Sequence, residues 1–190
     1  TSQRIAEQSE VKAPVEGTIE FDKLRFVERK DYFGKPVKVV VGRRGAIIIL
    51  NPDGTQNKRI EVPYGAELIV NEGQKVTRES TLYTQDPYNS LIISEYAGTV
   101  KFEDMIPGVT VQSQTDEQTG HVQKIVMDVK DKNLTPSIAI IDAEGNKKVY
   151  NIPFRAILTV EDGEEIQAGT VLAKISKSSA KTRDITGGLP

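Results

Sequence analysis

The chain has 190 residues, of which 25 are basic and 27 acidic, and its formal net charge is −2. This near balance excludes broad attraction to nucleic acid or to membrane surfaces driven by bulk charge. The absence of cysteine excludes disulfides, thiolate metal sites and cysteine nucleophiles, and no apolar run approaches the roughly 20 residues of a membrane span. We therefore expect a cytoplasmic protein with no membrane partner.

Residues 1–10 have a helix-friendly composition but are too few to form a stable helix alone, so we assign them to a tail. After them, alternating apolar and polar residues predict β-strands, as in Gly98–Met105, where Val100 and Phe102 share one face. The short apolar runs IIIL (47–50) and IAII (138–141) are each closed by a turn, Asn51-Pro-Asp-Gly54 and Ala143-Glu-Gly-Asn146. The fold class predicted from these patterns is all-β.

Two pairs of segments show that the sequence repeats itself. PVEGTIEFDKL (14–24) aligns with EYAGTVKFEDM (95–105), and VPYGAELIVNEGQKVTRESTL (62–82) aligns with IPFRAILTVEDGEEIQAGTVL (152–172). Apolar residues fall on apolar residues and turn glycines on turn glycines, although Glu79 stands opposite Gly169. The repeat predicts two β modules, at 11–90 and 91–176, followed by a linker at 177–190.

The second half of each module is similar to the hairpins of barrel-sandwich hybrids, the fold of biotinyl and lipoyl carriers. The pattern is Gly163-x-x-Ile166-x-x-Gly169-x-x-Leu172. A biotinyl carrier needs a lysine between methionines, which this chain lacks, and the Asp-Lys pairs at 22–23 and 131–132 are not followed by the alanine of lipoyl carriers. A carrier, or another β-barrel binding module, remains the alternative interpretation.

The end of the chain carries a more specific resemblance. Gly-Gly-Leu-Pro closes the sequence, and proline suits the first turn of a helix, so we expect a helix to follow. DITGGLP (184–190) resembles the start of the second trigger helix in the β′ (largest) subunit of bacterial RNA polymerase. AGTVKFEDMIPGVTVQSQTDEQTG (97–120) and VPYGAEL (62–68) resemble the second and first modules of an insertion found in the trigger loop of many such subunits.

This resemblance implies tandem sandwich-barrel hybrid modules that modulate trigger-loop folding, and hence nucleotide addition, pausing and transcript cleavage. The family binds catalytic Mg²⁺ through an NADFDGD motif, which this sequence lacks. The fragment is therefore expected to be no enzyme and to hold no cofactor, with Mg²⁺ bound elsewhere in the parent nucleotidyltransferase. The expected partners are the rest of β′ and the other polymerase subunits, with downstream DNA or transcription factors as further candidates.

No catalytic, cofactor-binding or metal-binding residue is expected in this chain. His121 is not the substrate-contacting trigger-helix histidine, which the resemblance places upstream of Thr1. The basic turn Gly42-Arg-Arg-Gly45 is either a hairpin tip with solvated arginines or a contact through Arg43 and Arg44 to phosphate or an acidic surface. The predicted trigger-helix junction comprises Asp184, Ile185, Thr186, Gly187, Gly188, Leu189 and Pro190.

Overall fold

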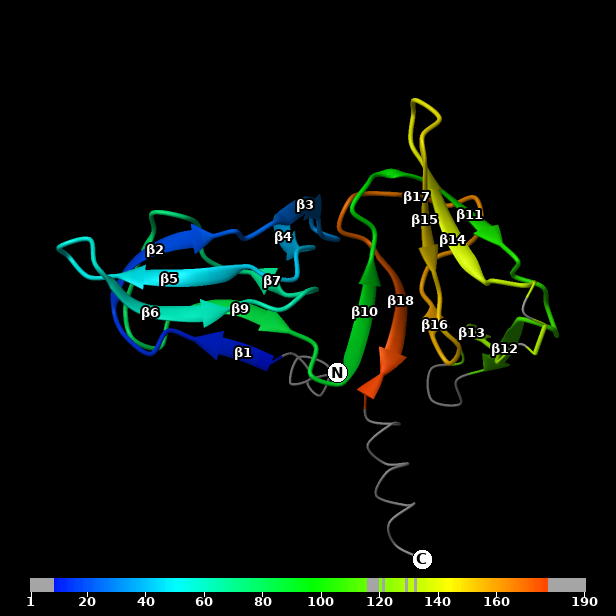
Figure 1. Cartoon of the computed structure of the whole chain (residues 1–190), viewed down its shortest axis with the longest axis horizontal. Coiled ribbons are helices and arrows are strands. Elements are labelled where there is room, and N and C mark those ends of the chain that lie inside the picture. The colour runs from blue at the N-terminus through cyan, green and yellow to red at the C-terminus, as the bar shows by residue number, and fades with distance from the viewer. Residues whose placement is uncertain (1–8, 116–119, 121, 129, 132, 178–190) are drawn as a thin grey trace, which may run out of the picture. The chain divides into compact units, whose positions relative to one another are not determined.

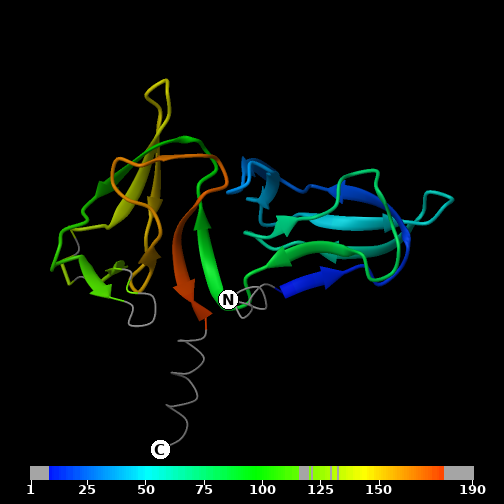
Figure 2. The same cartoon turned by 180° about the vertical axis from the view of Figure 1, so that it is seen from behind.

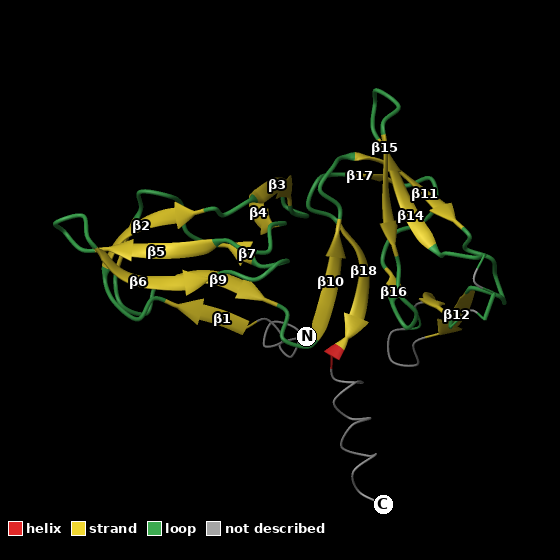
Figure 3. Ribbon diagram, viewed as in Figure 1, coloured by secondary structure: helices red, strands yellow, loops and turns green. Residues whose placement is uncertain are grey.

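The computed structural model describes residues 9–115, 120, 122–128, 130–131 and 133–177. Within these ranges the chain forms eighteen β-strands, and helical backbone is described only at Lys177 (Figures 1 and 3). The all-β prediction is thus confirmed. No helix in the described part of the chain is long and apolar enough to cross a membrane.

The chain divides into two compact units, the first ending at Pro87 and the second beginning at Tyr88. The first unit contains a five-stranded sheet in the order β1-β9-β7-β4-β3 and a four-stranded sheet in the order β6-β5-β2-β8, both antiparallel. Its strands are β1 (Ser9–Lys12), β2 (Gly17–Asp22), β3 (Phe26–Lys30), β4 (Pro36–Val40), β5 (Ala46–Leu50), β6 (Gln56–Glu61), β7 (Glu67–Leu68), β8 (Lys75–Val76) and β9 (Thr81–Gln85).

The second unit repeats this topology strand for strand. Its sheets run β10-β18-β16-β13-β12 and β15-β14-β11-β17, so each strand matches the one nine places earlier. Figure 2 shows the paired strands β1 and β9, and β10 and β18, from behind. The strands are β10 (Asn89–Ile93), β11 (Gly98–Glu103), β12 (Val111–Thr115), β13 (Val122–Val126), β14 (Ser137–Ile141), β15 (Lys147–Asn151), β16 (Ile157–Leu158), β17 (Glu165–Ile166) and β18 (Val171–Ser176).

Each unit has its own hydrophobic core, built from both of its sheets. In the first unit, Val40 and Leu82 from the five-stranded sheet share a buried cluster with Ile19 and Ile47 from the four-stranded sheet. The second core is made in the same way, from Val126, Leu172, Val100 and Ile138. Full burial of such a side chain stabilises the fold by about 1.5–3 kcal/mol, so the alternating apolar residues determine which face of each sheet turns inward.

The strands extend beyond two of the boundaries assigned from the sequence. Ser9 and Glu10, assigned to the tail, belong to β1 because they pair with Gln85 and Thr84 of β9. The boundary at residue 90 falls inside β10, whose partner β18 belongs to the second unit. The assignment of the two units as sandwich-barrel hybrid modules stays a prediction.

Equivalent turns of the two units keep the same left-handed backbone even where the residue differs. Glu79 has a φ of 74°, and its counterpart Gly169 has a φ of 88°. The reverse exchange occurs two turns earlier, where Gly65 has a φ of 90° and its counterpart Arg155 a φ of 76°. A residue with a Cβ is strained in this conformation, so each unit carries a strained residue where the other has glycine.

Candidate functional site

The candidate contact residues Arg43 and Arg44 lie in a link between sheets. The prediction of a hairpin tip was wrong, because Gly42–Gly45 connects β4 in one sheet to β5 in the other, and these two strands are not paired. The carbonyl oxygen of Arg25 accepts hydrogen bonds from the amides of Val41 (3.0 Å) and Gly42 (3.1 Å), which holds the start of the link against the chain after β2.

Glycine is required at position 45, at the end of this link, because the backbone there passes close to Leu24. A Cβ on Gly45 would lie 2.5 Å from Leu24 Cδ1 and 2.8 Å from Leu24 Cα. The backbone therefore turns tightly over Leu24. The two arginines between the glycines are both exposed.

Arg43 lies over an aromatic ring, which the sequence alone did not reveal. Its guanidinium carbon is 4.5 Å from the centroid of Tyr64, a cation–π distance that orients the planar group. The second unit has a similar contact at the equivalent aromatic residue, since Arg155 lies 5.4 Å from the Phe154 ring. Each unit thus presents an oriented guanidinium group, able to make bidentate bonds to carboxylate or phosphate.

A second repeated feature is a shallow groove beside an outer strand of each five-stranded sheet. In the first unit the groove has a volume of about 670 Å³, and Phe21, Leu24, Phe26 and Lys38 contribute to its lining. Phe21 and Phe26 meet edge to face, with centroids 5.9 Å apart, and Lys38 Nζ lies 5.9 Å from the Phe26 centroid. The groove is therefore aromatic with a cationic rim.

The groove of the second unit is smaller, about 270 Å³, and is lined in part by Phe102, Met105, Val111 and Lys124. Lys124 Nζ lies 5.8 Å from the Phe102 centroid. Lys124 occupies the position of Lys38, since each lies two residues before the valine that ends β4 or β13. The grooves are a duplicated candidate surface for apolar or aromatic groups, and sequence reasoning identified only the repeat behind them.

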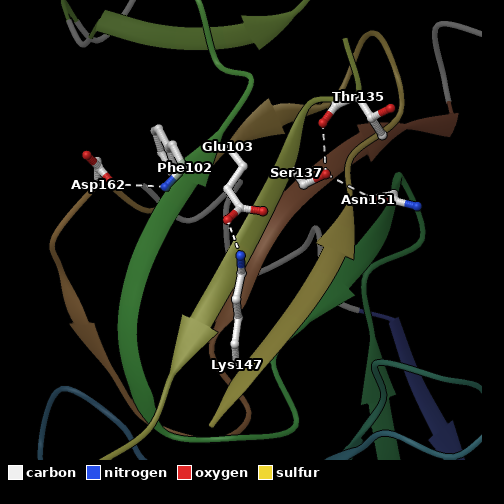
Figure 4. Close-up of polar contacts among 7 residues, drawn as sticks. All are labelled: Phe102, Glu103, Thr135, Ser137, Lys147, Asn151 and Asp162. Carbon is white, nitrogen blue, oxygen red and sulfur yellow. Dashed lines mark hydrogen bonds and ion pairs between the residues drawn. The ribbon is translucent and has the colours of Figure 1, made fainter. Parts of the chain in front are cut away.

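The polar contacts around the second groove are structural. The Phe102 amide donates to Asp162 Oδ1 (2.8 Å), matching the bond from the Phe21 amide to Glu72 Oε2 (3.1 Å). In the four-stranded sheet, Glu103 of β11 pairs with Lys147 of β15 at 2.5 Å across β14. Buried Ser137 of β14 donates to the Thr135 carbonyl (2.9 Å), as Figure 4 shows. Ser137 is thus held inside a hydrogen-bond network and is not a free nucleophile.

The motif DMIPGVT (104–110) forms a loop that the first unit replaces with a shorter link. Thr110 is fully buried, and its hydroxyl accepts from the Ile106 amide (2.6 Å) and donates to the Asp104 carbonyl (2.6 Å). Asp104 itself has a φ of 56°, and its carboxylate accepts from the Thr135 amide (2.9 Å). The residues that carry the family resemblance here therefore build a turn, rather than a chemical site.

Two carboxylates among the described residues have lowered pKa values. Hydrogen bonds from the side chain and amide of Thr55 lower the pKa of Asp53, and bonds from the amide and side chain of Asn146 lower the pKa of Asp142. Both carboxylates only close turns. Across the described ranges, no group of three or more His, Asp or Glu side chains could hold a metal ion.

Of the remaining residues considered from the sequence, some lie in the described structure and others outside it. Lys23, considered for a carrier, lies in the link from β2 to β3 in different sheets and lines the first groove, so it is not at a hairpin tip. His121, Lys132 and the predicted junction from Asp184 to Pro190 lie outside the described residues.

Several curated proteins similar to this chain are named as the same polymerase subunit. The chain is 43% identical over its full length to the DNA-directed RNA polymerase subunit β′ of Salinibacter ruber and 42% identical to that of Koribacter versatilis. Over 98% of its length it is 38% identical to the subunit of Porphyromonas cangingivalis. The chain spans only 13–16% of the length of these relatives, and no protein-family model matches it.

Proposed function

We propose that this chain is a non-catalytic insertion in the trigger loop of a bacterial RNA polymerase β′ subunit. The observation that carries the proposal is similarity over 98–100% of the chain to only 13–16% of named β′ subunits. The resemblance of residues 184–190 to the second trigger helix supports the position within that subunit. The two compact units with separate cores support a role as a folded body.

The mechanism follows from where such a body would sit. In the family, the trigger loop folds into helices over the incoming nucleotide and unfolds for translocation. An insert between those helices moves at each cycle, and its contacts with neighbouring surfaces bias the open–closed equilibrium. A difference of about 1.4 kcal/mol changes that equilibrium tenfold, so weak contacts of exposed groups such as Arg43 and Arg44 are sufficient.

The remaining assignments belong to the parent enzyme. We place the chain in the cytoplasm, in contact with the rest of β′ and the other polymerase subunits, and with downstream DNA or transcription factors as further candidates. The Mg²⁺ that supports nucleotide transfer would be held by residues outside this chain. The chain itself would alter the rate of nucleotide addition, pausing or transcript cleavage.

The test is a deletion of Val11–Ser176 in the parent β′ subunit, with the flanks joined by a short flexible linker. RNA synthesis should persist, because the Mg²⁺ ligands and substrate-contacting residues lie elsewhere, while single-nucleotide addition on a stalled complex, pausing or cleavage should change. The matched control is a deletion of Gly187–Pro190, which should damage catalysis itself. Equal collapse of both enzymes, or no change from the larger deletion, would contradict the proposal.

A further inference from the structure

The hairpin between β3 and β4 exposes two neighbouring aromatic side chains at its tip. Tyr32 is 96% exposed and Phe33 is 81% exposed, the highest values among the large apolar side chains that the structure describes. Their rings contact each other edge to face, with centroids 5.3 Å apart and an interplanar angle of 77°. Exposed apolar groups gathered in one place indicate an interaction surface.

The turn beneath these rings is closed by four hydrogen bonds. The Asp31 amide donates to the Lys35 carbonyl (2.9 Å), and Gly34 donates to the Asp31 carbonyl (3.0 Å). Asp31 Oδ1 accepts from the amides of Phe33 and Lys35, both at 2.9 Å. The ring pair is therefore held by an ordered turn, which reduces the conformational entropy lost when the rings are buried by a partner.

The charges at the tip indicate what kind of surface it fits. Residues 30–35 carry two lysines and one aspartate, a net charge of +1, and Lys30 and Lys35 stand on either side of the two aromatic residues along the chain. Tyrosine and phenylalanine are enriched at the centres of protein interfaces, and flanking lysines favour an acidic rim. The complementary surface is an apolar pocket bordered by Asp or Glu.

A nucleic-acid strand fits this tip less well than a protein does. Single-stranded binding uses open ring faces along a positively charged groove. Here the two rings lie against each other edge to face, so they do not offer parallel open faces to successive bases. The partner is therefore a protein.

We propose that the Tyr32–Phe33 tip docks into an acid-rimmed apolar pocket on the protein surface of the polymerase that carries this chain. The inference rests on the proposed function, and more than four-fifths of the length of the related β′ subunits lies outside the region that this chain matches. That large remaining surface, together with the other subunits, supplies the partner. The tip is specific to the first unit, because its counterpart in the second, residues 116–121, reads DEQTGH and contains no aromatic residue.

The experiment is photo-crosslinking in the assembled polymerase. The probe p-benzoylphenylalanine replaces Phe33 in the full β′ subunit, and the same probe at Val149, which is 47% exposed on β15, is the matched control. The Phe33 probe should crosslink to a polymerase peptide containing Asp or Glu, with a yield about tenfold above the control, as expected for an interface anchor. Crosslinking to DNA or RNA, to a second copy of this chain, or no crosslinking above the control would overturn the proposal.

Two variants complete the test without disturbing the core. Tyr32→Ser combined with Phe33→Ser should change single-nucleotide addition in the same direction as the deletion of Val11–Ser176, with an unchanged unfolding temperature. Lys35→Glu should lower the crosslinking yield severalfold, and an unchanged yield would contradict the acidic rim. If the deletion changes the rate but the double variant does not, the docking tip is wrong and the proposed function stands; if the deletion changes nothing, the proposed function fails on its own.

Discussion

The first and second units have the same strand order in both of their sheets, but they differ in the loops and turns that join those strands. The first unit has a tight link after β2 and an aromatic tip between β3 and β4. The second has a longer loop tied by buried Thr110 after β11, and its four-stranded sheet begins at Gly98 as the first begins at Gly17. A duplicated framework therefore constrains the core and leaves the connections free to differ.

The largest expected effect tests whether the equivalent strands of the two units are packed equally closely at Gly98 and Gly17. A Cβ on Gly98 would contact the Ile141 carbonyl oxygen and lie 2.9 Å from Ile140 Cγ2. A Cβ on Gly17 would contact the Leu50 carbonyl oxygen and lie 2.6 Å from Ile49 Cγ2. Gly98→Ala and Gly17→Ala should each lower the free energy of unfolding by about 3 kcal/mol, at the upper end for overpacking.

Denaturant unfolding of the 190-residue chain measures this loss, and hydrogen exchange locates it. Protection should fall most in β11 and β14 for Gly98→Ala and in β2 and β5 for Gly17→Ala. A loss below about 0.5 kcal/mol, the size of an ordinary surface substitution, would show that the strands can move apart. The two units would then not share the close strand packing inferred at Gly17 and Gly98.

The next effect concerns the loop that only the second unit has. Thr110→Val removes the hydroxyl that bonds the Ile106 amide and the Asp104 carbonyl, so the free energy of unfolding should fall by about 2 kcal/mol. Thr110→Ser keeps the hydroxyl and is the control, with a smaller loss from the missing methyl group. Thermal unfolding of both variants gives the comparison, and equal losses would mean that packing, rather than hydrogen bonding, holds the loop.

A smaller and opposite effect is expected at the strained turn positions. Glu79→Gly should raise the free energy of unfolding by about 1 kcal/mol, because glycine adopts the left-handed backbone without the Cβ strain. Arg155→Gly should gain less, since it also loses the contact with the Phe154 ring. Gly169→Ala is the reciprocal control and should destabilise the second unit. Denaturant midpoints measure all three, and a gain at Arg155 exceeding that at Glu79 would contradict the stacking contact.

The smallest effect is on pH dependence. The pKa values of Asp53 and Asp142 are lowered from 3.8 by hydrogen bonds made in the folded turns. Their stabilisation is therefore present above pH 3.8 and is lost as the pH falls through the lower folded-state pKa values. Unfolding temperatures measured from pH 5 downward should fall less steeply for Asp53→Asn and Asp142→Asn than for the parent chain. An identical slope would show that the turns do not favour the ionised carboxylate.

The sequence predicted the strands and the repeat because these depend on local periodicity. Ile19 and Val100 each lie between two polar residues, and both are buried as that alternation requires. Glu79 was visible as an exception to the repeat, but only the backbone shows that its turn is retained under strain.

The contact surfaces were harder to predict because they depend on residues distant in sequence. Arg43 and Tyr64 are separated along the chain by strands β5 and β6, and nothing in the local pattern of either residue indicates their contact. Tyr32 and Phe33 have the composition of strand residues, so pattern alone favours burial, whereas the turn at Asp31 turns them outward. Thr110 is polar and resembles a loop residue, yet it is fully buried.

The pairing of first and last strands has a consequence for how such a body joins a longer chain. Ser9 pairs with Gln85 in the first unit, and Asn89 pairs with Ser176 in the second. The first and last strands of each unit are therefore paired with each other, so the unit begins and ends at neighbouring points. A unit with adjacent ends can be inserted into any loop whose two sides lie close together. Either unit could therefore be removed or transplanted by cutting before its first strand and after its last, with little rearrangement of the flanking chain.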